Sequence, residues 1–280
     1  MTKSVVTYLW EGREFIPAYV NALARMVKHH LPEPHRFICV SEVTEGFSPE
    51  VEVLPMPPAA RALGRVRSPE GSKFPSSYRR LWTFSKEATV LGEVVLQLDI
   101  DCIIVSDLRP LFEYTEDFVG WKVRPPPGGP MRFGGGTWLH RTGTRTYVYD
   151  RFVADPEGSI DKARAAGYRG SDQAWISYCL TNTECYWPEP SGIFCSQDYK
   201  GSSSPGRYVI RNQTRQRSGR SYTVRRKIFE PWPVVSVPAG GIILHYNGSA
   251  DSKPWTSSDP VVMQFWRPFS DEEQERLAQA

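Results

Sequence analysis

Residues 93–108 read Glu93-Val-Val-Leu-Gln-Leu-Asp99-Ile-Asp101-Cys-Ile-Ile-Val-Ser-Asp-Leu108. In this stretch an apolar run of strand length leads directly to two carboxylates that one residue separates. In open α/β sheets, ligands bind beyond the carboxyl ends of the strands. The stretch therefore predicts a buried strand of an α/β protein, with a ligand site that begins at Asp99 and Asp101.

The sequence before this stretch alternates between strand patterns and a helix pattern. β-Branched and aromatic residues predict strands at 4–10, 35–41 and 51–54, and apolar residues at helical spacing predict a helix over 14–30. Such alternation is typical of a parallel sheet with helices on its faces. We therefore expect a Rossmann-like, mostly parallel sheet.

The remaining segments are less regular. The Pro-rich and Gly-rich stretch 55–75 predicts a long loop, and residues 76–91 predict a helix. A further strand is predicted at 118–123. The glycine run 134–136 permits close backbone approach, or a loop that becomes ordered only when a ligand binds.

The two carboxylates at the strand end suit a hard divalent cation. Oxygen ligands are those that Mn²⁺ and Mg²⁺ prefer, and an ion held by Asp99 and Asp101 would bridge to a diphosphate. The alternative interpretation is that Asp99 caps a turn and that Asp101 is solvated.

A second segment, 242–255, supplies complementary chemistry. A short apolar strand delivers His245, which is a good Mn²⁺ ligand, although a histidine there is also compatible with ordinary core packing. Gly248 allows backbone to approach a phosphate, and Lys253 carries a positive charge for the same group. The two segments together predict a site for a metal-bound nucleoside diphosphate.

The chain resembles the family 8 glycosyltransferases, which include glycogenin and the bacterial lipopolysaccharide galactosyltransferases. The resemblance extends over roughly residues 3–255 and rests on four segments in the same order. They are Tyr78-Arg-Arg80-Leu81, Leu98 to Phe112 with its Asp-x-Asp, Ser171-Asp172-Gln173, and His245 to Trp255. It implies a GT-A fold and a metal-dependent transfer of a hexose from a UDP-sugar, UDP-glucose or UDP-galactose.

The resemblance also implies residue roles. Asp99, Asp101 and His245 would hold Mn²⁺ or Mg²⁺, and Asp172 and Gln173 would lie beside the anomeric carbon, where they favour transfer with retention. The donor would contact Thr7, Tyr8, Trp10, Arg80, Ile100, Gly248 and Lys253. Core packing is the alternative role for Tyr8 and Trp10, and a solvent-facing position is the alternative for Arg79.

Two departures from the family pattern concern the donor. Four residues separate Gly248 from the Lys-Pro-Trp element that begins at Lys253, where the family usually has two. The family's Phe-Asn-Ala-Gly is replaced by Phe133-Gly134-Gly135-Gly136. The first change concerns the reach of Lys253, and the second concerns which sugar hydroxyls are contacted.

Composition indicates one folded domain. With 280 residues, of which 40% are hydrophobic, the chain has enough apolar residues for one sizeable core. We expect a nucleotide-binding half at 1–124, an acceptor-side half at 125–255 and a C-terminal helix at 256–280. No apolar run approaches the roughly 18 residues that span a bilayer, and five cysteines without a Cys-x-x-Cys pair indicate thiols in a reducing cytoplasm.

Positive charge is concentrated in the segment 200–227, within a C-terminal third of the chain that we expect to be irregular. The whole chain has a net charge of only +3, yet no acidic residue lies between Asp198 and Glu230. Basic residues mixed with Tyr, Asn and Gln suit contacts to phosphates and stacking on bases. The predicted acceptor contacts are Arg211, Arg215, Arg217 and Arg220.

These residues favour a nucleic-acid acceptor, such as a hydroxymethylated base in phage DNA that is flipped into the site. A solvated loop, and a saccharide or glycolipid acceptor, remain open alternatives. A nucleic-acid-binding protein with a vestigial site is the non-enzymatic alternative. A sugar-1-phosphate nucleotidyltransferase is disfavoured because the N-terminal region lacks a glycine-rich signature.

Overall fold

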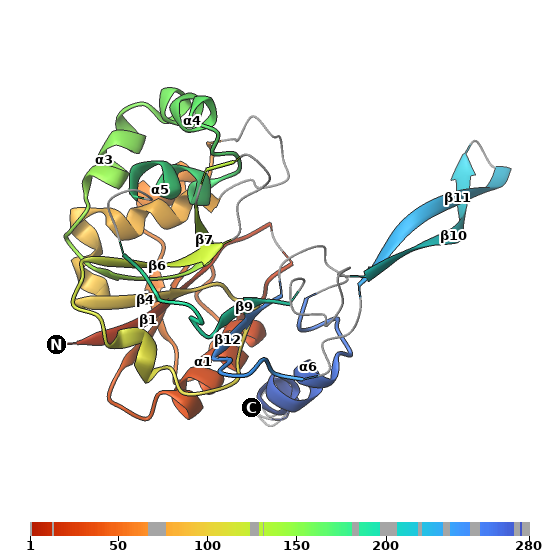
Figure 1. Ribbon diagram of the computed structural model, residues 1–280, viewed down its shortest axis with the longest axis horizontal. Coiled ribbons are helices and arrows are strands. Elements are labelled where there is room, and N and C mark those ends of the chain that lie inside the picture. The colour runs from red at the N-terminus through yellow and green to blue at the C-terminus, as the bar shows by residue number, and fades with distance from the viewer. Residues whose placement is uncertain are drawn as a thin grey trace.

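The computed structural model describes residues 2–12, 14–66, 77–123, 129–130, 132–180, 185–196, 206–217, 220–231, 236–246, 253–271 and 275. Within these ranges, a seven-stranded sheet forms the centre of the molecule (Figure 1). Its strands follow the order β3-β2-β1-β4-β7-β6-β8. They are β1 (Lys3–Leu9), β2 (Arg36–Ser41), β3 (Glu52–Pro55), β4 (Val94–Leu98), β6 (Phe118–Val123), β7 (Arg132–Arg141) and β8 (Cys185–Tyr186).

The predicted mostly parallel α/β architecture is confirmed. Strands β3, β2, β1 and β4 are parallel neighbours, β6 and β8 are parallel to each other, and β7 is antiparallel to β4 and β6. The apolar run that ends at Asp99 is β4, and all five of its residues are buried. It lies between β1 and β7, so the two acids leave the sheet at its centre.

Alternate residues of the central strands pack against different layers of helix. Val5, Leu9 and Leu96 belong to the core beneath α1 (Pro17–His30), whereas Val6 and Val95 belong to a second cluster on the other face. Helices α3 (Tyr147–Ala154), α4 (Pro156–Ala165) and α5 (Asp172–Leu180) lie on the side of the sheet opposite α1 (Figure 1). The strands are therefore buried on both faces, as parallel sheets generally are.

Two helical segments differ from their predicted form. The stretch predicted as a loop over 55–75 contains α2 (Pro58–Leu63), which begins with proline in its first turn and continues with Ala-rich sequence of high helix propensity. The helix predicted over 76–91 is two 3₁₀ helices, η1 (Ser77–Phe84) and η2 (Lys86–Leu91). They are separate because Ser85 between them has extended backbone, with φ −74° and ψ 162°.

A small second sheet joins distant parts of the chain. Its middle strand, β12 (Ile243–His245), is antiparallel to β5 (Cys102–Ile104) and parallel to β9 (Ile193–Cys195). The register places His245 opposite Cys102, directly after Asp101. The amide of Tyr246 also donates a hydrogen bond of 3.0 Å to the carbonyl of Asp101.

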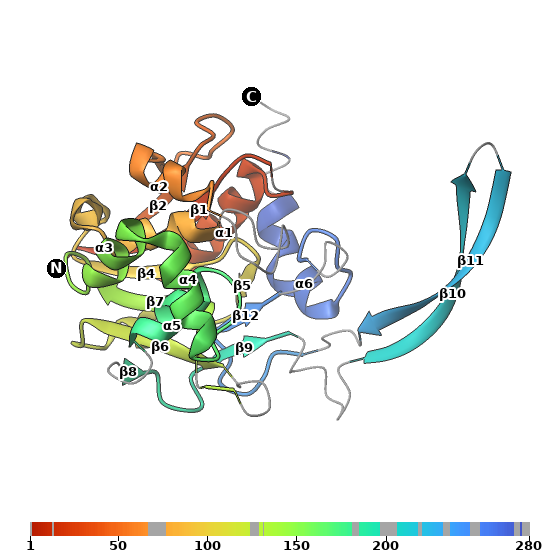
Figure 2. The same ribbon diagram turned by 90° about the horizontal axis from the view of Figure 1, so that it is seen from above.

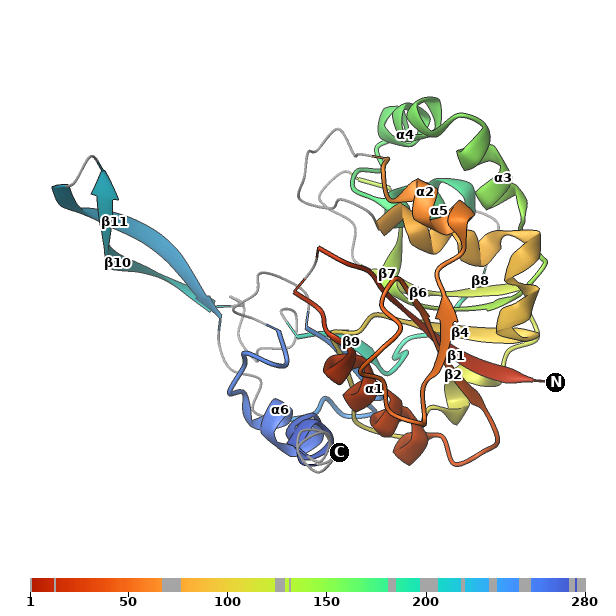
Figure 3. The same ribbon diagram turned by 180° about the vertical axis from the view of Figure 1, so that it is seen from behind.

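The basic segment forms a regular hairpin, not the irregular structure expected from sequence. β10 (Gly206–Arg217) pairs with β11 (Arg220–Pro231) in twelve antiparallel register positions. This two-stranded ribbon projects away from the body of the molecule (Figures 1 and 3). Regular pairing arises because β-branched and aromatic residues recur in both strands.

The C-terminal segment is helical in two pieces. Helix α6 (Pro260–Phe265) begins with proline in its first turn, and residues 267–271 are helical after a turn at Trp266. The helix expected from 256 onward therefore begins four residues later. No helix among the described residues is long and apolar enough to cross a membrane.

Candidate functional site

The two acids lie where β4 ends and the chain turns into β5. The turn is anchored to β7, because the amide of Asp99 donates a 2.9 Å hydrogen bond to the carbonyl of Gly136. Asp101 is almost fully buried, whereas about a third of the Asp99 side chain is exposed. Burial raises the pKa of the Asp99 carboxyl to about 6; Arg80 opposes this shift and Asp101 adds to it.

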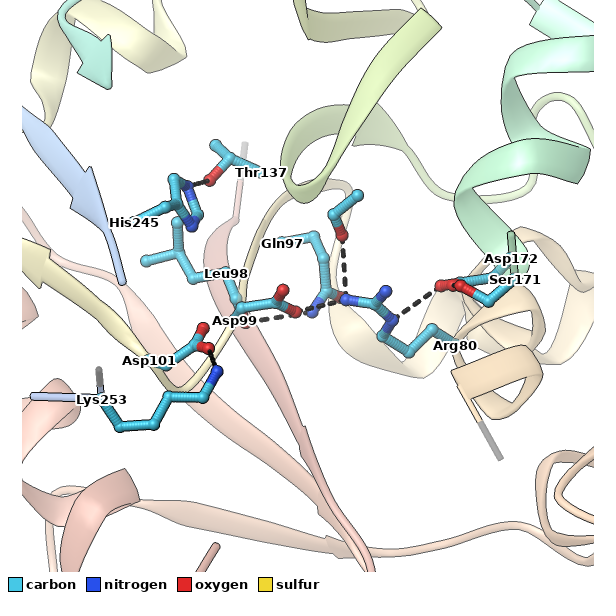
Figure 4. A network of polar contacts seen from close by, with 11 residues as sticks. Arg80, Gln97, Leu98, Asp99, Asp101, Thr137, Ser171, Asp172, His245 and Lys253 are labelled. Atoms are coloured by element: carbon cyan, nitrogen blue, oxygen red, sulfur yellow. Dashed lines mark hydrogen bonds and ion pairs between the residues drawn. The ribbon is translucent and has the colours of Figure 1, made fainter. Parts of the chain in front are cut away.

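Arg80 links both halves of the site (Figure 4). From η1 its Nη1 donates to Asp99 Oδ1 and, at 2.9 Å, to the carbonyl of Gly135, while its Nε donates to Asp172 Oδ2 at 2.7 Å. Arg79 instead donates to Glu42 at 3.1 Å. The two arginines are thus distinguished, and Arg80 is the one that contacts the predicted site residues.

Lys253 reaches the acids despite the longer spacing from Gly248. Its ammonium group forms a buried ion pair with Asp101 Oδ2 (Figure 4) and lies 5.8 Å from the centre of the Phe15 ring. The four intervening residues thus still allow Lys253 to reach Asp101, and its contact with a phosphate stays a prediction. Gly248 itself lies outside the described residues.

His245 is held as a neutral, fixed imidazole. Its Nε2 lies 2.7 Å from Thr137 Oγ1, and its ring stacks on Trp121 with centroids 4.8 Å apart. Burial lowers the pKa of His245 to about 4, so the ring is uncharged near neutral pH. Its Nδ1 is buried and has no hydrogen-bond partner among the residues that the structure describes.

The glycine run lies within β7, which corrects the expectation of a loop that becomes ordered on ligand binding. All three glycines are in contact with side chains that leave little room for a Cβ. A Cβ on Gly134 would come within 2.2 Å of the Trp121 ring, and one on Gly135 within 3.0 Å of Gln173 Cβ. A Cβ on Gly136 would lie 2.8 Å from His245 Nδ1 and 3.0 Å from Asp99 Oδ2.

The geometry at Gly136 tests whether the residues fit a metal ion. An unpartnered imidazole nitrogen and a carboxylate oxygen both lie within 3.0 Å of the place that a Cβ on Gly136 would take, and Thr137 orients the imidazole as second-layer groups do in metal sites. These donors suit Mn²⁺ or Mg²⁺.

A complete ligand set is not assembled. No group of three or more His, Cys, Asp and Glu side chains within the described ranges is arranged to hold a metal. Each of the two acids is paired with a basic side chain instead, Asp99 with Arg80 and Asp101 with Lys253.

The Asp172–Gln173 pair lies at the first turn of α5. Asp172 is completely buried, and its two oxygens accept hydrogen bonds from Arg80 and from the Ser171 hydroxyl at 2.7 Å. Gln173 donates to the carbonyl of Phe133 at 2.7 Å. Asp172 therefore orients Arg80, while Gln173 is the half-buried member of the pair, beside the glycine run.

The predicted nucleoside contacts are mainly packed in the core. Tyr8 is buried and its hydroxyl is hydrogen-bonded to Thr83, and Ile100 is 4% exposed. Trp10 lies beneath the Arg79 guanidinium, 5.6 Å from the ring centre. Thr7 is fully buried, and its hydroxyl has no partner in the described part of the chain.

Sequence reasoning missed Thr137 and Trp121. Thr137 directly follows the glycine run, where the sequence departs from the family pattern. This position was the local sign that Thr137 belongs to the site. Trp121 had no local signal, because only the pairing of β6 with β7 brings it to Gly134 and His245. The predicted acceptor contacts Arg211, Arg215, Arg217 and Arg220 all lie in the projecting ribbon.

This sheet order, with acids at the end of a central strand and a histidine from a late strand, has the GT-A architecture. The chain is similar to the galactosyltransferase LgtC, solved in complex with donor and acceptor sugar analogs, with a TM-score of 0.59 and 16% identity over 96% of this chain and 95% of LgtC. An active-site mutant of LgtC gives a TM-score of 0.58 and 15% identity over the same shares.

The glycosyltransferase GlyE of Streptococcus pneumoniae gives a TM-score of 0.50 and 14% identity over 96% of this chain and 61% of GlyE. No protein-family model matches the sequence, and no curated protein matches it. The similarity therefore confirms the expected fold, which is that of glycosyltransferases.

Proposed function

We propose that the protein is a metal-dependent glycosyltransferase that moves a hexose from a UDP-sugar. One observation carries this proposal: the buried Nδ1 of His245, which has no hydrogen-bond partner among the described residues, and Asp99 Oδ2 both lie within 3.0 Å of the place that a Cβ on Gly136 would take. A buried polar atom without a partner is costly, and a bound ion supplies the missing interaction. The fold shared with glycosyltransferases supports the same function.

Asp99, Asp101 and His245 would hold Mn²⁺ or Mg²⁺. When bound, the ion supplies Lewis-acid stabilisation of the charge that develops on the departing diphosphate. Lys253, which the structure pairs with Asp101, would supply positive charge to the diphosphate. Arg80 would remain oriented by Asp172, because that contact does not involve the metal ligands.

Gln173 would stabilise positive charge at the anomeric carbon. An amide oxygen is a poor nucleophile, and Asp172 is buried with both oxygens in hydrogen bonds, so neither residue suits a covalent glycosyl intermediate. Given the retention that the resemblance to family 8 implies, the arrangement favours direct transfer on one face of the sugar over a covalent intermediate. This differs from the two-carboxylate mechanism of most glycoside hydrolases.

The acceptor that we favour is DNA, with a hydroxymethylated base as the receiving group. The projecting ribbon supports this choice, because it carries the basic segment of a chain whose net charge is only +3. A saccharide or glycolipid acceptor is the alternative. The five free thiols favour the reducing cytoplasm as the compartment.

The donor reaction is tested by Asp101→Asn, which keeps the side-chain volume but removes the charge. We expect release of UDP from UDP-glucose or UDP-galactose in the presence of Mn²⁺ to fall at least about 100-fold, because the metal loses a ligand. Asp107→Asn is the matched control, since this carboxylate of the same stretch pairs with Arg109 at the surface.

Equal turnover by Asp101→Asn, or turnover that persists in EDTA, would contradict the metal role. Absence of UDP release by the unaltered protein with every common donor, combined with DNA binding, would instead identify a nucleic-acid-binding protein with a vestigial site.

A further inference from the structure

The register of the β10–β11 ribbon assigns each residue to one of two faces. Directly paired residues of an antiparallel ribbon share a face, and successive residues along a strand alternate between faces. The pairs Arg211–Arg226, Arg215–Tyr222 and Arg217–Arg220 therefore belong to one face. The pairs Asn212–Arg225 and Ile210–Lys227 belong to the other.

Charge is divided unequally between the two faces. The first, here called the arginine face, contains six arginines and one acid: Arg207, Arg211, Arg215, Arg217, Arg220, Arg226 and Glu230. The second, here called the polar face, contains Arg225 and Lys227 as its basic residues. Glu230 pairs with Arg207 at the base of the ribbon, so the outer part of the arginine face has no acid to balance its charge.

Two of the pairs place like charges directly opposite each other. Arg211 pairs with Arg226, and Arg217 pairs with Arg220 next to the tip. Like charges in directly opposed positions destabilise an antiparallel pair. An isolated ribbon gains nothing from this arrangement, whereas a ribbon that binds a polyanion gains attraction at every one of these positions.

The ribbon leaves the fold beside the candidate metal site. It is inserted between the parallel neighbours β9 and β12 (Figure 2), and the amide of Ser196, just after β9, donates a 2.8 Å hydrogen bond to the carbonyl of His245.

We propose that the arginine face binds the phosphate backbone of double-stranded DNA. The major groove admits a two-stranded ribbon, and twelve residues at about 3.3 Å each span roughly 40 Å, about one turn of the duplex. The proposal rests on the proposed function, because it identifies the class of acceptor that the transferase engages.

The polar face argues against a membrane surface as the partner. Toward the tip it holds Asn212, Thr214, Gln216, Ser221 and Thr223. On this face the structure describes the exposure of four residues, and all four are exposed: Asn212, Ser221, Thr223 and Arg225. An element that lies in a membrane interface needs an apolar face as well as a basic one. A duplex requires only the basic face.

The test compares two double variants that remove the same charge from neighbouring register positions. Arg211→Gln with Arg226→Gln alters the arginine face, and Arg225→Gln with Lys227→Gln alters the polar face. Binding of a fluorescent 30-base-pair duplex is measured by anisotropy between 50 and 200 mM salt. The arginine-face variant should bind the duplex at least about tenfold more weakly. The slope of the logarithm of the binding constant against the logarithm of the salt concentration should become shallower by about 2, because each of the two lost phosphate contacts removes about 0.9 from it.

The polar-face variant should bind within about twofold of the unaltered protein. Equal weakening by both variants, no binding of the duplex by the unaltered protein, or preferential binding of phosphatidylserine vesicles would overturn the proposal. UDP release from the sugar donor, measured in parallel, reports separately on the proposed function and on folding. It should be unchanged in both variants, so loss of duplex binding with intact UDP release concerns the ribbon alone.

Discussion

At Gly136 a side chain is excluded, because a Cβ there would lie 2.8 Å from His245 Nδ1 and 3.0 Å from Asp99 Oδ2. The neighbouring glycines are required for different reasons, because Gly134 contacts the Trp121 ring and Gly135 contacts Gln173. The glycines of this one strand therefore meet two different structural requirements. Gly134 serves packing between β6 and β7, and Gly136 serves the site.

This separation predicts different effects for two alanine substitutions. Gly136→Ala should reduce Mn²⁺ affinity at least about tenfold, since its Cβ would lie within 3.0 Å of both His245 and Asp99, and it should lower the midpoint of thermal unfolding as well, because the His245 ring is buried. Gly134→Ala should lower the unfolding midpoint, since its Cβ would meet a buried ring and overpacking typically costs about 1–3 kcal/mol. Isothermal titration with Mn²⁺ distinguishes the two, and thermal melts measure the loss of stability in each. The same loss of metal affinity in both variants would count against the distinction.

At the scale of elements, β7 connects the site to the helices that support it. Besides the glycine run, it carries His140, whose ring Nε2 contacts the carbonyl of Thr83 in η1 at 3.0 Å. Burial lowers the pKa of His140 to about 4. The contact between β7 and η1 helps to position Arg80, which lies in the same short helix.

The His140 contact predicts how stability depends on pH. The unfolded chain takes up a proton near pH 6.5, whereas folded His140 takes one up only near pH 4, so protons favour unfolding between these values. The free energy of unfolding should fall by about 1.4 kcal/mol per pH unit for this group as pH decreases from about 6.5 toward 4, and His245 acts in the same sense. Urea unfolding of the unaltered protein and of His140→Gln between pH 7.5 and 5 measures this. An identical pH slope in the variant would exclude His140 as a source.

At the scale of the whole molecule, the ribbon and the body are separate pieces of structure. Strands β10 and β11 pair with each other and with no other described strand, while β5, β12 and β9 form a separate sheet that carries His245. In the proposed function, donor chemistry and acceptor binding would therefore belong to different parts of one chain.

Removal of the ribbon should therefore spare the body. Replacing residues 206–231 with a short Gly-Ser linker should leave the midpoint of thermal unfolding and metal-dependent UDP release nearly unchanged, while transfer of sugar to hydroxymethylated DNA is lost. Calorimetry, UDP release and incorporation of radiolabelled sugar measure the three quantities. Collapse of UDP release together with the unfolding midpoint would show that the ribbon stabilises the site.

Sequence alone determined the central strands, the position of Asp99 and Asp101 at the end of β4, and the order of the segments that resemble glycosyltransferases. These features depend on local periodicity and on residue chemistry, which can be recognised without knowing what lies nearby. Tertiary structure alone decided that Arg80 contacts both Asp99 and Asp172, that Trp121 stacks on His245, and that the basic segment pairs into a ribbon with one arginine-rich face. These features depend on strand order and register, which bring residues together that are far apart in the chain, and no local pattern specifies such contacts.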